Sequence, residues 1–179
     1  ICERFSPRRQ ENDGDILRKY HLKSGYILIM GNGLPHKNLG VLLELSHQLK
    51  RKLVFNGVPQ KNITYWQTKV PNATAIWMPH VAEQDLPAVV RGAFCLAQPS
   101  TAEGYGYPPL EAMACGIPAV VSNIPVLTET TGNKTLTADS DKPQAWLESF
   151  SALEDNDFYA LQIEKGLKWV APMRGQNGW

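Results

Sequence analysis

The sequence predicts an α/β fold: a Rossmann-like, three-layer domain with a parallel sheet of about six strands. Apolar runs of strand length alternate with helical patterns five or six times along the 179 residues. This alternation is typical of a parallel sheet with helices on both faces. Glycine-containing loops follow two of the apolar runs, at 31–33 and 104–106. A ligand is therefore expected at the carboxyl ends of those two strands, at a topological switch point.

Length and composition suit one globular domain. Of the 179 residues, 43% are hydrophobic and 20% are charged, which is enough for a full hydrophobic core. Residues 14–170 carry the alternating pattern and are predicted to form the domain. Residues 1–13 are polar and are predicted as a linker. Residues 171–179 lose the periodicity and are predicted as a tail.

Charge and cysteine content argue against several classes of function. A formal net charge of +1 gives no reason to expect nucleic acid or an anionic membrane as the main partner. The three cysteines lack metal-ligand spacing, and Cys95 and Cys115 lie in apolar contexts typical of buried residues. We therefore expect no metal and a reducing, cytoplasmic location. No apolar run approaches the ~20 residues of a membrane-spanning helix.

The first elements of the domain prepare one loop for an anion. A short helix is predicted over 16–20 and a buried strand over 26–30, which ends at Gly31-Asn32-Gly33. A helix is then predicted from Pro35 to about Lys50, with leucines along one side. A strand, a glycine loop and a helix start form a corner that suits phosphate.

The remaining elements repeat this alternation on both sides of a central stretch. Before it, strands are predicted over 53–57, 73–77 and 93–97, with helices over 60–69 and 82–92. After it, strands are predicted over 119–123 and 135–138, with helices over 124–129, 142–153 and 155–170.

The central stretch, residues 103–118, predicts a glycine-rich loop followed by a short helix. Pro108 and Pro109 suit a first helical turn, where the missing N–H groups would be unpaired anyway. Gly116 suits a left-handed helix end, and Pro118 prevents the helix from resuming. The loop thus receives backbone N–H groups and the positive end of a helix dipole, as an anion site does.

Two carboxylates flank this loop, Glu103 before the helix and Glu111 within it. Carboxylates accept hydrogen bonds from sugar diols, so a ligand with both phosphate and hydroxyl groups would use the whole arrangement. Each part also has a simpler interpretation. The loop could be only a tight turn, Glu111 could compensate the helix dipole, and Glu103 could be a solvated charge. The combination, followed directly by a second buried strand, favours a site.

The stretch from Pro99 to Pro118 resembles the signature of retaining glycosyltransferases of the GT-B fold. The resemblance is carried by Pro99-Ser100, Glu103-Gly104-Tyr105-Gly106, Leu110-Glu111-Ala112-Met113-Ala114-Cys115-Gly116 and Pro118. That group, glycosyl transferases group 1 or family 4, carries two glutamates with seven residues between them. The similarity extends in register from about residue 16 to residue 166, the span of the donor-binding C-terminal domain. Tyr105 stands where many members carry Phe. The resemblance implies that this domain is half of a GT-B fold.

The resemblance also implies a role for Lys37. Lys37-Asn38 matches a Lys-Asn pair whose lysine contacts the donor diphosphate, and that charge would let the bond to the leaving group break without a metal. The family's upstream arginine is missing, because Asn32 follows Gly31. Either Lys37 and backbone donors suffice, or another contact substitutes. A lysine at a helix start is ordinarily only solvated, but it is not what the dipole favours there.

The implied function is transfer of a hexose from a nucleotide-diphospho-sugar, GDP- or UDP-linked, to an acceptor hydroxyl with retained configuration, in polysaccharide or glycoconjugate synthesis. Glu111 would accept the ribose hydroxyls and Glu103 would lie near the sugar ring. Whether Glu103 is a nucleophile or only electrostatic stays open. The implied catalytic residues are Glu103 and Lys37. The implied donor-binding residues are Gly31, Asn32, Gly33, Lys37, His80, Val81, Glu103, Gly104, Tyr105, Gly106, Leu110 and Glu111.

Two alternatives share the same loop and helix: a non-catalytic nucleotide-sugar-binding module and a GT-B-fold sugar-nucleotide epimerase. NAD is not favoured, because Gly31 and Gly33 lack a third glycine in register, and no cofactor is expected. The resemblance implies an N-terminal acceptor domain outside this chain. We expect the chain alone to bind donor weakly without turnover. Peripheral association of the full-length enzyme with the inner face of a membrane stays an alternative.

Overall fold

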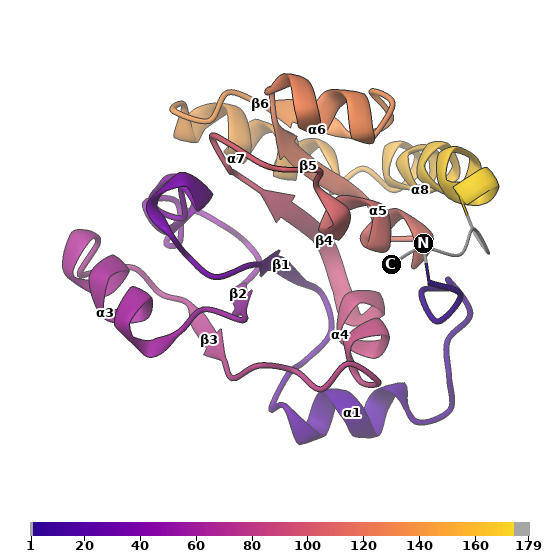
Figure 1. Ribbon diagram of the computed structural model, residues 1–179, viewed down its shortest axis with the longest axis horizontal. Coiled ribbons are helices and arrows are strands. Elements are labelled where there is room, and N and C mark those ends of the chain that lie inside the picture. Colours follow the sequence, from indigo (N-terminus) through magenta and orange to yellow (C-terminus); the bar gives the residue numbers. More distant parts are fainter. Residues whose placement is uncertain (1, 174–179) are drawn as a thin grey trace.

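The computed structural model describes residues 2–173 as a six-stranded sheet between two layers of helices (Figure 1). All neighbouring strands are parallel, in the order β3-β2-β1-β4-β5-β6. This confirms the three-layer, Rossmann-like prediction. The strands are β1 (Tyr26–Met30), β2 (Leu53–Asn56), β3 (Ile76–Met78), β4 (Ala93–Gln98), β5 (Ala119–Ser122) and β6 (Leu136–Ala138).

The helices connect the strands and cover both faces of the sheet (Figure 1). They are α1 (Asp13–Lys19), α2 (Gly40–Leu43), α3 (Gln60–Lys69), α4 (Leu86–Gly92), α5 (Tyr107–Ala114), α6 (Pro125–Thr130), α7 (Pro143–Ala152) and α8 (Asn156–Val170), with 3-10 turns η1 (Pro35–Lys37) and η2 (Ala171–Met173).

Two hydrophobic clusters fill the space on either side of the sheet. Because successive strand residues point to opposite faces, Leu28 of β1 packs with α4 and α5 while Ile27 and Ile29 pack with α2 and α7. Trp146 of α7 is fully buried in the second cluster. Removing a large aromatic side chain from such a position costs about 3–5 kcal/mol.

The predicted helix from Pro35 to about Lys50 is wrong. Asn38 takes a left-handed conformation at φ 53° and ends η1 after three residues. Its side-chain amide donates to the carbonyl oxygens of Pro99 and Ser140, at 3.1 and 2.5 Å, which fixes that break. After the four residues of α2, the N–H groups of Leu45, Ser46 and Gln48 donate to carbonyls three residues back, so turns replace the helix.

Two other boundaries differ from the prediction because local hydrogen bonds delay the element. The strand predicted from residue 73 begins at Ile76, since the N–H of Thr74 donates to Ser46 Oγ at 3.0 Å. The helix predicted from residue 82 begins at Leu86, after a turn in which the N–H of Asp85 donates to the Ala82 carbonyl.

The polar N-terminal segment packs against the domain. Phe5 is 2% exposed and lies in the first cluster. Arg91 of α4 forms a buried ion pair with Asp13 at 2.6 Å, and the Arg91 guanidinium holds the pKa of that carboxyl below its ordinary value. Of the predicted tail, residues 171–173 form η2, and 174–179 lie outside the described residues.

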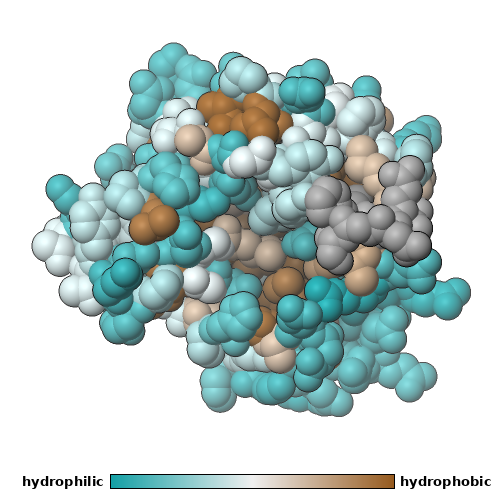
Figure 2. All heavy atoms as spheres, viewed as in Figure 1, coloured by the Kyte–Doolittle hydropathy of each residue, from teal (hydrophilic) through white to brown (hydrophobic). Residues whose placement is uncertain are grey.

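The surface on the face seen in Figure 1 is largely hydrophilic, and apolar residues appear on it as separate patches (Figure 2). None of the helices within residues 2–173 is both long and apolar enough to span a membrane. Within the same residues, His, Cys, Asp and Glu side chains do not gather in a group of three or more suited to a metal ion.

Candidate nucleotide-sugar site

The site lies where the strand order reverses, between β1 and β4 at the centre of the sheet. Chain connections leave those two strands in opposite directions, and the carboxyl ends of the strands face a common opening. The connection after β1 contains Gly31 to Lys37, and the one after β4 contains Pro99 to Gly106. The N–H of Thr101 donates to the His36 carbonyl at 2.8 Å, so the two connections are tied together.

Glu103 is held at this junction by three donors that converge on one oxygen. Its Oε1 accepts hydrogen bonds from Lys37 Nζ at 2.7 Å, from Ser100 Oγ at 2.5 Å and from the Gln98 amide. The Glu103 side chain is only 10% exposed. Burial by itself would raise the pKa of this carboxyl. The bonds from Lys37, Ser100 and Gln98 together outweigh burial and hold the pKa below its ordinary value.

Lys37 supplies the positive charge of the site. Its side chain is 16% exposed and leaves η1 to reach Glu103 across the junction. It passes close to the backbone of Gly31, where an added Cβ would lie 3.5 Å from the lysine Cε. A cation and a carboxylate thus share a small, partly desolvated space, where charge interactions are stronger than in water.

Glu111 lies on α5 in a different setting. The side chain is half-buried, and none of the hydrogen bonds and ion pairs found within residues 2–173 includes its carboxylate. Burial raises the pKa of Glu111, and the charge of Arg4 only partly opposes that effect. A half-buried carboxylate without a protein donor is suited to accept hydrogen bonds from a ligand.

Gly106 joins the Glu103 loop to α5. It has φ 93°, and an added Cβ would lie 2.6 Å from Leu127 Cδ2, so both backbone conformation and space require glycine. The neighbouring Tyr105 carbonyl accepts a hydrogen bond from Thr130 Oγ1 at 2.7 Å. The rings of Tyr105 and Tyr107 lie 4.7 Å apart. Contacts of Tyr105 and Gly106 therefore fix the segment between the Glu103 loop and α5.

The loop after β1 is ordered by its own contacts. Asn32 Oδ1 accepts a hydrogen bond from the N–H of Leu34 at 3.1 Å, so the side chain shapes the turn and adds no charge. Gly33 has φ 67°, and an added Cβ would lie 2.6 Å from Val58. Trp66 of α3 donates its indole N–H to the Gly33 carbonyl at 2.7 Å. Asn32 adds no charge, so the cation that this loop contributes to the site is Lys37.

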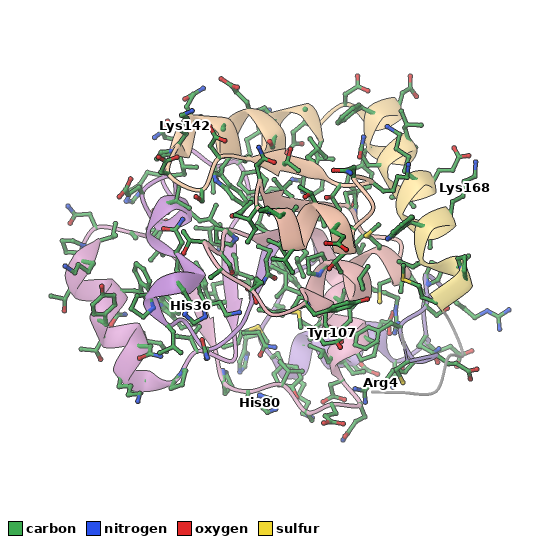
Figure 3. The ribbon with its side chains drawn as sticks, turned by 45° about the horizontal axis from the view of Figure 1, so that its top comes forward. Arg4, His36, His80, Tyr107, Lys142 and Lys168 are labelled. Carbon is green, nitrogen blue, oxygen red and sulfur yellow. The ribbon has the colours of Figure 1, made fainter. Side chains whose placement is uncertain are left out.

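The other predicted residues lie at different depths. His80 follows β3 and is exposed, whereas Val81 is 2% exposed and donates its N–H to Asn56 Oδ1 at 3.3 Å. The Leu110 side chain is 2% exposed and lies in the core. In the view of Figure 3, His36, Tyr107, His80 and Arg4 lie in the lower half, below Lys142 on the segment before α7 and Lys168 on α8.

Sequence reasoning did not identify Gln98 or assign a function to Ser100, although both side chains donate toward Glu103. Ser100 belongs to the Pro99-Ser100 pair just after β4. Gln98 is the last residue of β4 and interrupts its apolar pattern. A glutamine at the carboxyl end of a buried strand was the available signal, because buried polar groups need hydrogen-bond partners.

Comparison with known proteins shows which proteins this chain is similar to. The family model described as "Glycosyl transferases group 1" matches residues 15–169. The chain is 30% identical to "O-antigen chain mannosyltransferase B" of Escherichia coli, over 97% of this chain and 49% of that protein. The chain therefore spans about half the length of that curated relative.

Two solved structures share the fold. The C-terminal domain of the glycosyl transferase group 1 family protein LpcC from Francisella tularensis superposes with a TM-score of 0.76 at 17% identity, over 96% of this chain and 97% of that domain. Anabaena HepE in complex with UDP-glucose superposes with a TM-score of 0.73 at 16% identity, over 93% of this chain and 49% of that one.

Proposed function

Because the chain belongs to the glycosyl transferases group 1 family, we propose that it is the donor-binding domain of a retaining hexosyltransferase. Its substrate would be a nucleotide-diphospho-sugar, and the hexose would pass to an acceptor hydroxyl in polysaccharide or glycoconjugate synthesis. The observation that carries the proposal is the Lys37–Glu103 pair at the point where the strand order reverses, with Glu111 on the helix that follows the Glu103 loop. This place in an open α/β sheet is where ligands bind.

In this proposal each of the three charged groups contacts a different part of the donor. Lys37 neutralises the diphosphate, whose negative charge grows as the bond to the sugar breaks. Glu111 accepts the ribose hydroxyls, which provide the hydrogen bonds that this carboxylate lacks within residues 2–173. Glu103 faces the hexose, where it accepts a hydroxyl or stabilises positive charge at the anomeric carbon. Attack by Glu103 and attack by the acceptor on the leaving-group face are both compatible with this arrangement.

In the ligand-free protein Lys37 is bound to Glu103 at 2.7 Å. A diphosphate carries more negative charge than the carboxylate and attracts the lysine toward itself. Glu103 then keeps the bonds from Ser100 and Gln98 and stays in place. Ligand binding therefore exchanges one partner of Lys37 for another, while Glu103 keeps two neutral donors.

The mannosyltransferase name of the Escherichia coli relative supports a mannosyl donor, and the UDP-glucose complex of HepE supports a nucleotide-sugar in this kind of fold. An N-terminal domain outside these 179 residues would supply the acceptor site. We propose that no metal or cofactor takes part and that the enzyme is cytoplasmic, with the full-length protein either free or peripheral at a membrane.

Calorimetric titration with UDP, GDP, UDP-glucose and GDP-mannose tests the proposal. We expect weak binding of one nucleotide and of its sugar conjugate, and loss of that binding of about 1–3 kcal/mol in Lys37→Met. Asn32→Arg adds the charge that the loop lacks and should strengthen the interaction. Equal failure of all four ligands to bind both the unaltered chain and Asn32→Arg would contradict the proposed donor site.

A further inference from the structure

Gln98 contains a buried polar atom that lacks a partner. The residue is 2% exposed, and its side-chain Oε1 is the one buried side-chain oxygen or nitrogen within residues 2–173 without a hydrogen bond. Such an atom is costly relative to a paired one. An apolar residue of similar size would avoid this cost, so the amide requires an explanation.

The apolar surroundings account for the unpaired oxygen. Gln98 pairs with Val121 on the neighbouring strand β5, and side chains of paired residues lie on the same face of the sheet. Val121 belongs to the hydrophobic cluster that also contains Leu96 and Leu110. The side chain thus extends over a surface that is otherwise hydrophobic, and this surface favours leucine or methionine rather than glutamine.

The other half of the amide has clear partners. Nε2 donates to Glu103 Oε1 and to Ser100 Oγ, the latter at 3.4 Å. Rotating the amide by 180° would place its carbonyl oxygen against the carboxylate, which repels it. The orientation is therefore set by Glu103. In this orientation the amide nitrogen donates to the carboxylate, and the amide oxygen is left without a hydrogen bond.

We propose that Gln98 is a positioning residue that fixes the Glu103 carboxylate for the sugar part of the donor. This inference rests on the proposed function, in which Lys37 moves from Glu103 to the diphosphate. Gln98 and Ser100 are then the two remaining donors to Oε1. They hold the carboxylate in place, with its second oxygen, Oε2, directed to the hexose.

A positioning role explains why Gln98 is present although its side-chain oxygen has no hydrogen-bond partner. A residue that serves only the fold would be selected for its packing, and Gln98 packs with an unpaired oxygen. Stability is given up locally so that a charged group is held in one position, which is a common relation at functional sites. Loss of the Gln98 amide should therefore affect binding of the sugar conjugate more than it affects stability.

The substitution Gln98→Met separates these roles, because methionine has a similar length and no polar group. Its free energy of unfolding should stay close to that of the unaltered chain, because removal of the unpaired oxygen offsets the lost donor to Glu103. The pKa of Glu103 should rise, since a donor to its charged form is lost. That pKa is measured without ligand by NMR of ¹³C-labelled glutamate carboxyls, with Glu103→Gln to assign the signal.

Calorimetry supplies the second readout. Gln98→Met should bind the nucleotide-sugar about three- to tenfold more weakly and the bare nucleotide as tightly as before. Ser100→Ala should raise the pKa of Glu103 in the same direction. Gln162→Met is the matched control, because Gln162 is a buried glutamine of α8 at 7% exposure and should leave the pKa of Glu103 unchanged.

The outcomes distinguish this inference from the proposed function. An unchanged pKa of Glu103 in Gln98→Met, or destabilisation with equal loss of nucleotide and nucleotide-sugar, would overturn the role of Gln98. Absence of any nucleotide-sugar binding by the unaltered chain would instead count against the proposed function, while the ligand-free pKa comparison would still decide whether Gln98 positions Glu103.

Discussion

The loop that carries Glu103 and the helix that carries Glu111 belong to one short stretch of chain, yet they treat their carboxylates in opposite ways. Glu103 is bound by three protein donors and its pKa is lowered. Glu111 is half-buried, and its pKa is raised by burial. The first carboxylate is prepared by the protein. The second has no protein donor within residues 2–173, and this difference is the one we expect if the two carboxylates serve different parts of one ligand.

The largest expected effect on stability comes from replacing Gly106, which connects the Glu103 loop to α5. In Gly106→Ala the new Cβ would contact Leu127 and the residue would have to keep φ 93°. We expect a loss of about 2–4 kcal/mol in the free energy of unfolding, measured by urea denaturation, together with loss of nucleotide binding. Gly104→Ala is the control, because an added Cβ there would meet no atom within 4 Å. A stability of Gly106→Ala equal to that of Gly104→Ala would remove the strain argument.

A smaller effect should follow from removing the cation of the Glu103 loop. Lys37→Met leaves Glu103 buried with two neutral donors, and we expect a loss of about 1–3 kcal/mol in stability. Lys142→Met is the matched control, since its ion pair with Asp139 has side chains that are 67% and 43% exposed and exposed pairs contribute about 0–1 kcal/mol. Similar losses in both variants would show that the Lys37 pair is no different from a surface pair.

Neutralising Glu111 should change the free energy of unfolding in the opposite direction. Glu111→Gln removes a charge that burial disfavours, so at neutral pH the free energy of unfolding should stay the same or rise by up to about 1 kcal/mol. Thermal denaturation at pH 7 measures this. A clear loss of stability would mean that Glu111 has a stabilising partner in the folded chain.

The two carboxylates should also differ in how pH affects stability. The lowered pKa of Glu103 adds stability that is present above its ordinary pKa of 4.5 and is lost as pH falls toward the folded value. The raised pKa of Glu111 acts in reverse, because its cost appears as pH rises through the folded value. Denaturation of Glu103→Gln from pH 4.5 downward, and of Glu111→Gln from pH 4.5 upward, should give slopes that depart from the unaltered chain in opposite directions.

Much of the fold was predictable from periodicity and turn residues. The strand over 26–30 and the helix over 60–69 have the predicted bounds. Gly116 takes the expected left-handed conformation at φ 71°. The long helix after Pro35 was not predictable as a set of turns, because the break at Asn38 depends on carbonyls 61 and 102 residues away. Tertiary contacts there override local propensity.

The pairings within the candidate site were not predictable from the sequence. The sequence indicated Lys37, Glu103 and Glu111, and the sheet order brings the first two within 2.7 Å. Periodicity cannot reveal that Gln98 donates to Glu103, because that contact arises from a side-chain orientation within the core. Nor could spacing alone predict that Glu111 would have a raised pKa and Glu103 a lowered one.

The most direct test of the account compares Glu103→Gln with Glu111→Gln in calorimetric titrations of a nucleotide and its sugar conjugate at pH 7. We predict that Glu111→Gln weakens both ligands equally, by about 1–3 kcal/mol, because both contain the ribose. Glu103→Gln should weaken only the sugar conjugate. Unchanged binding in both variants, or equal loss of the bare nucleotide in both, would contradict the division of the donor between the two carboxylates.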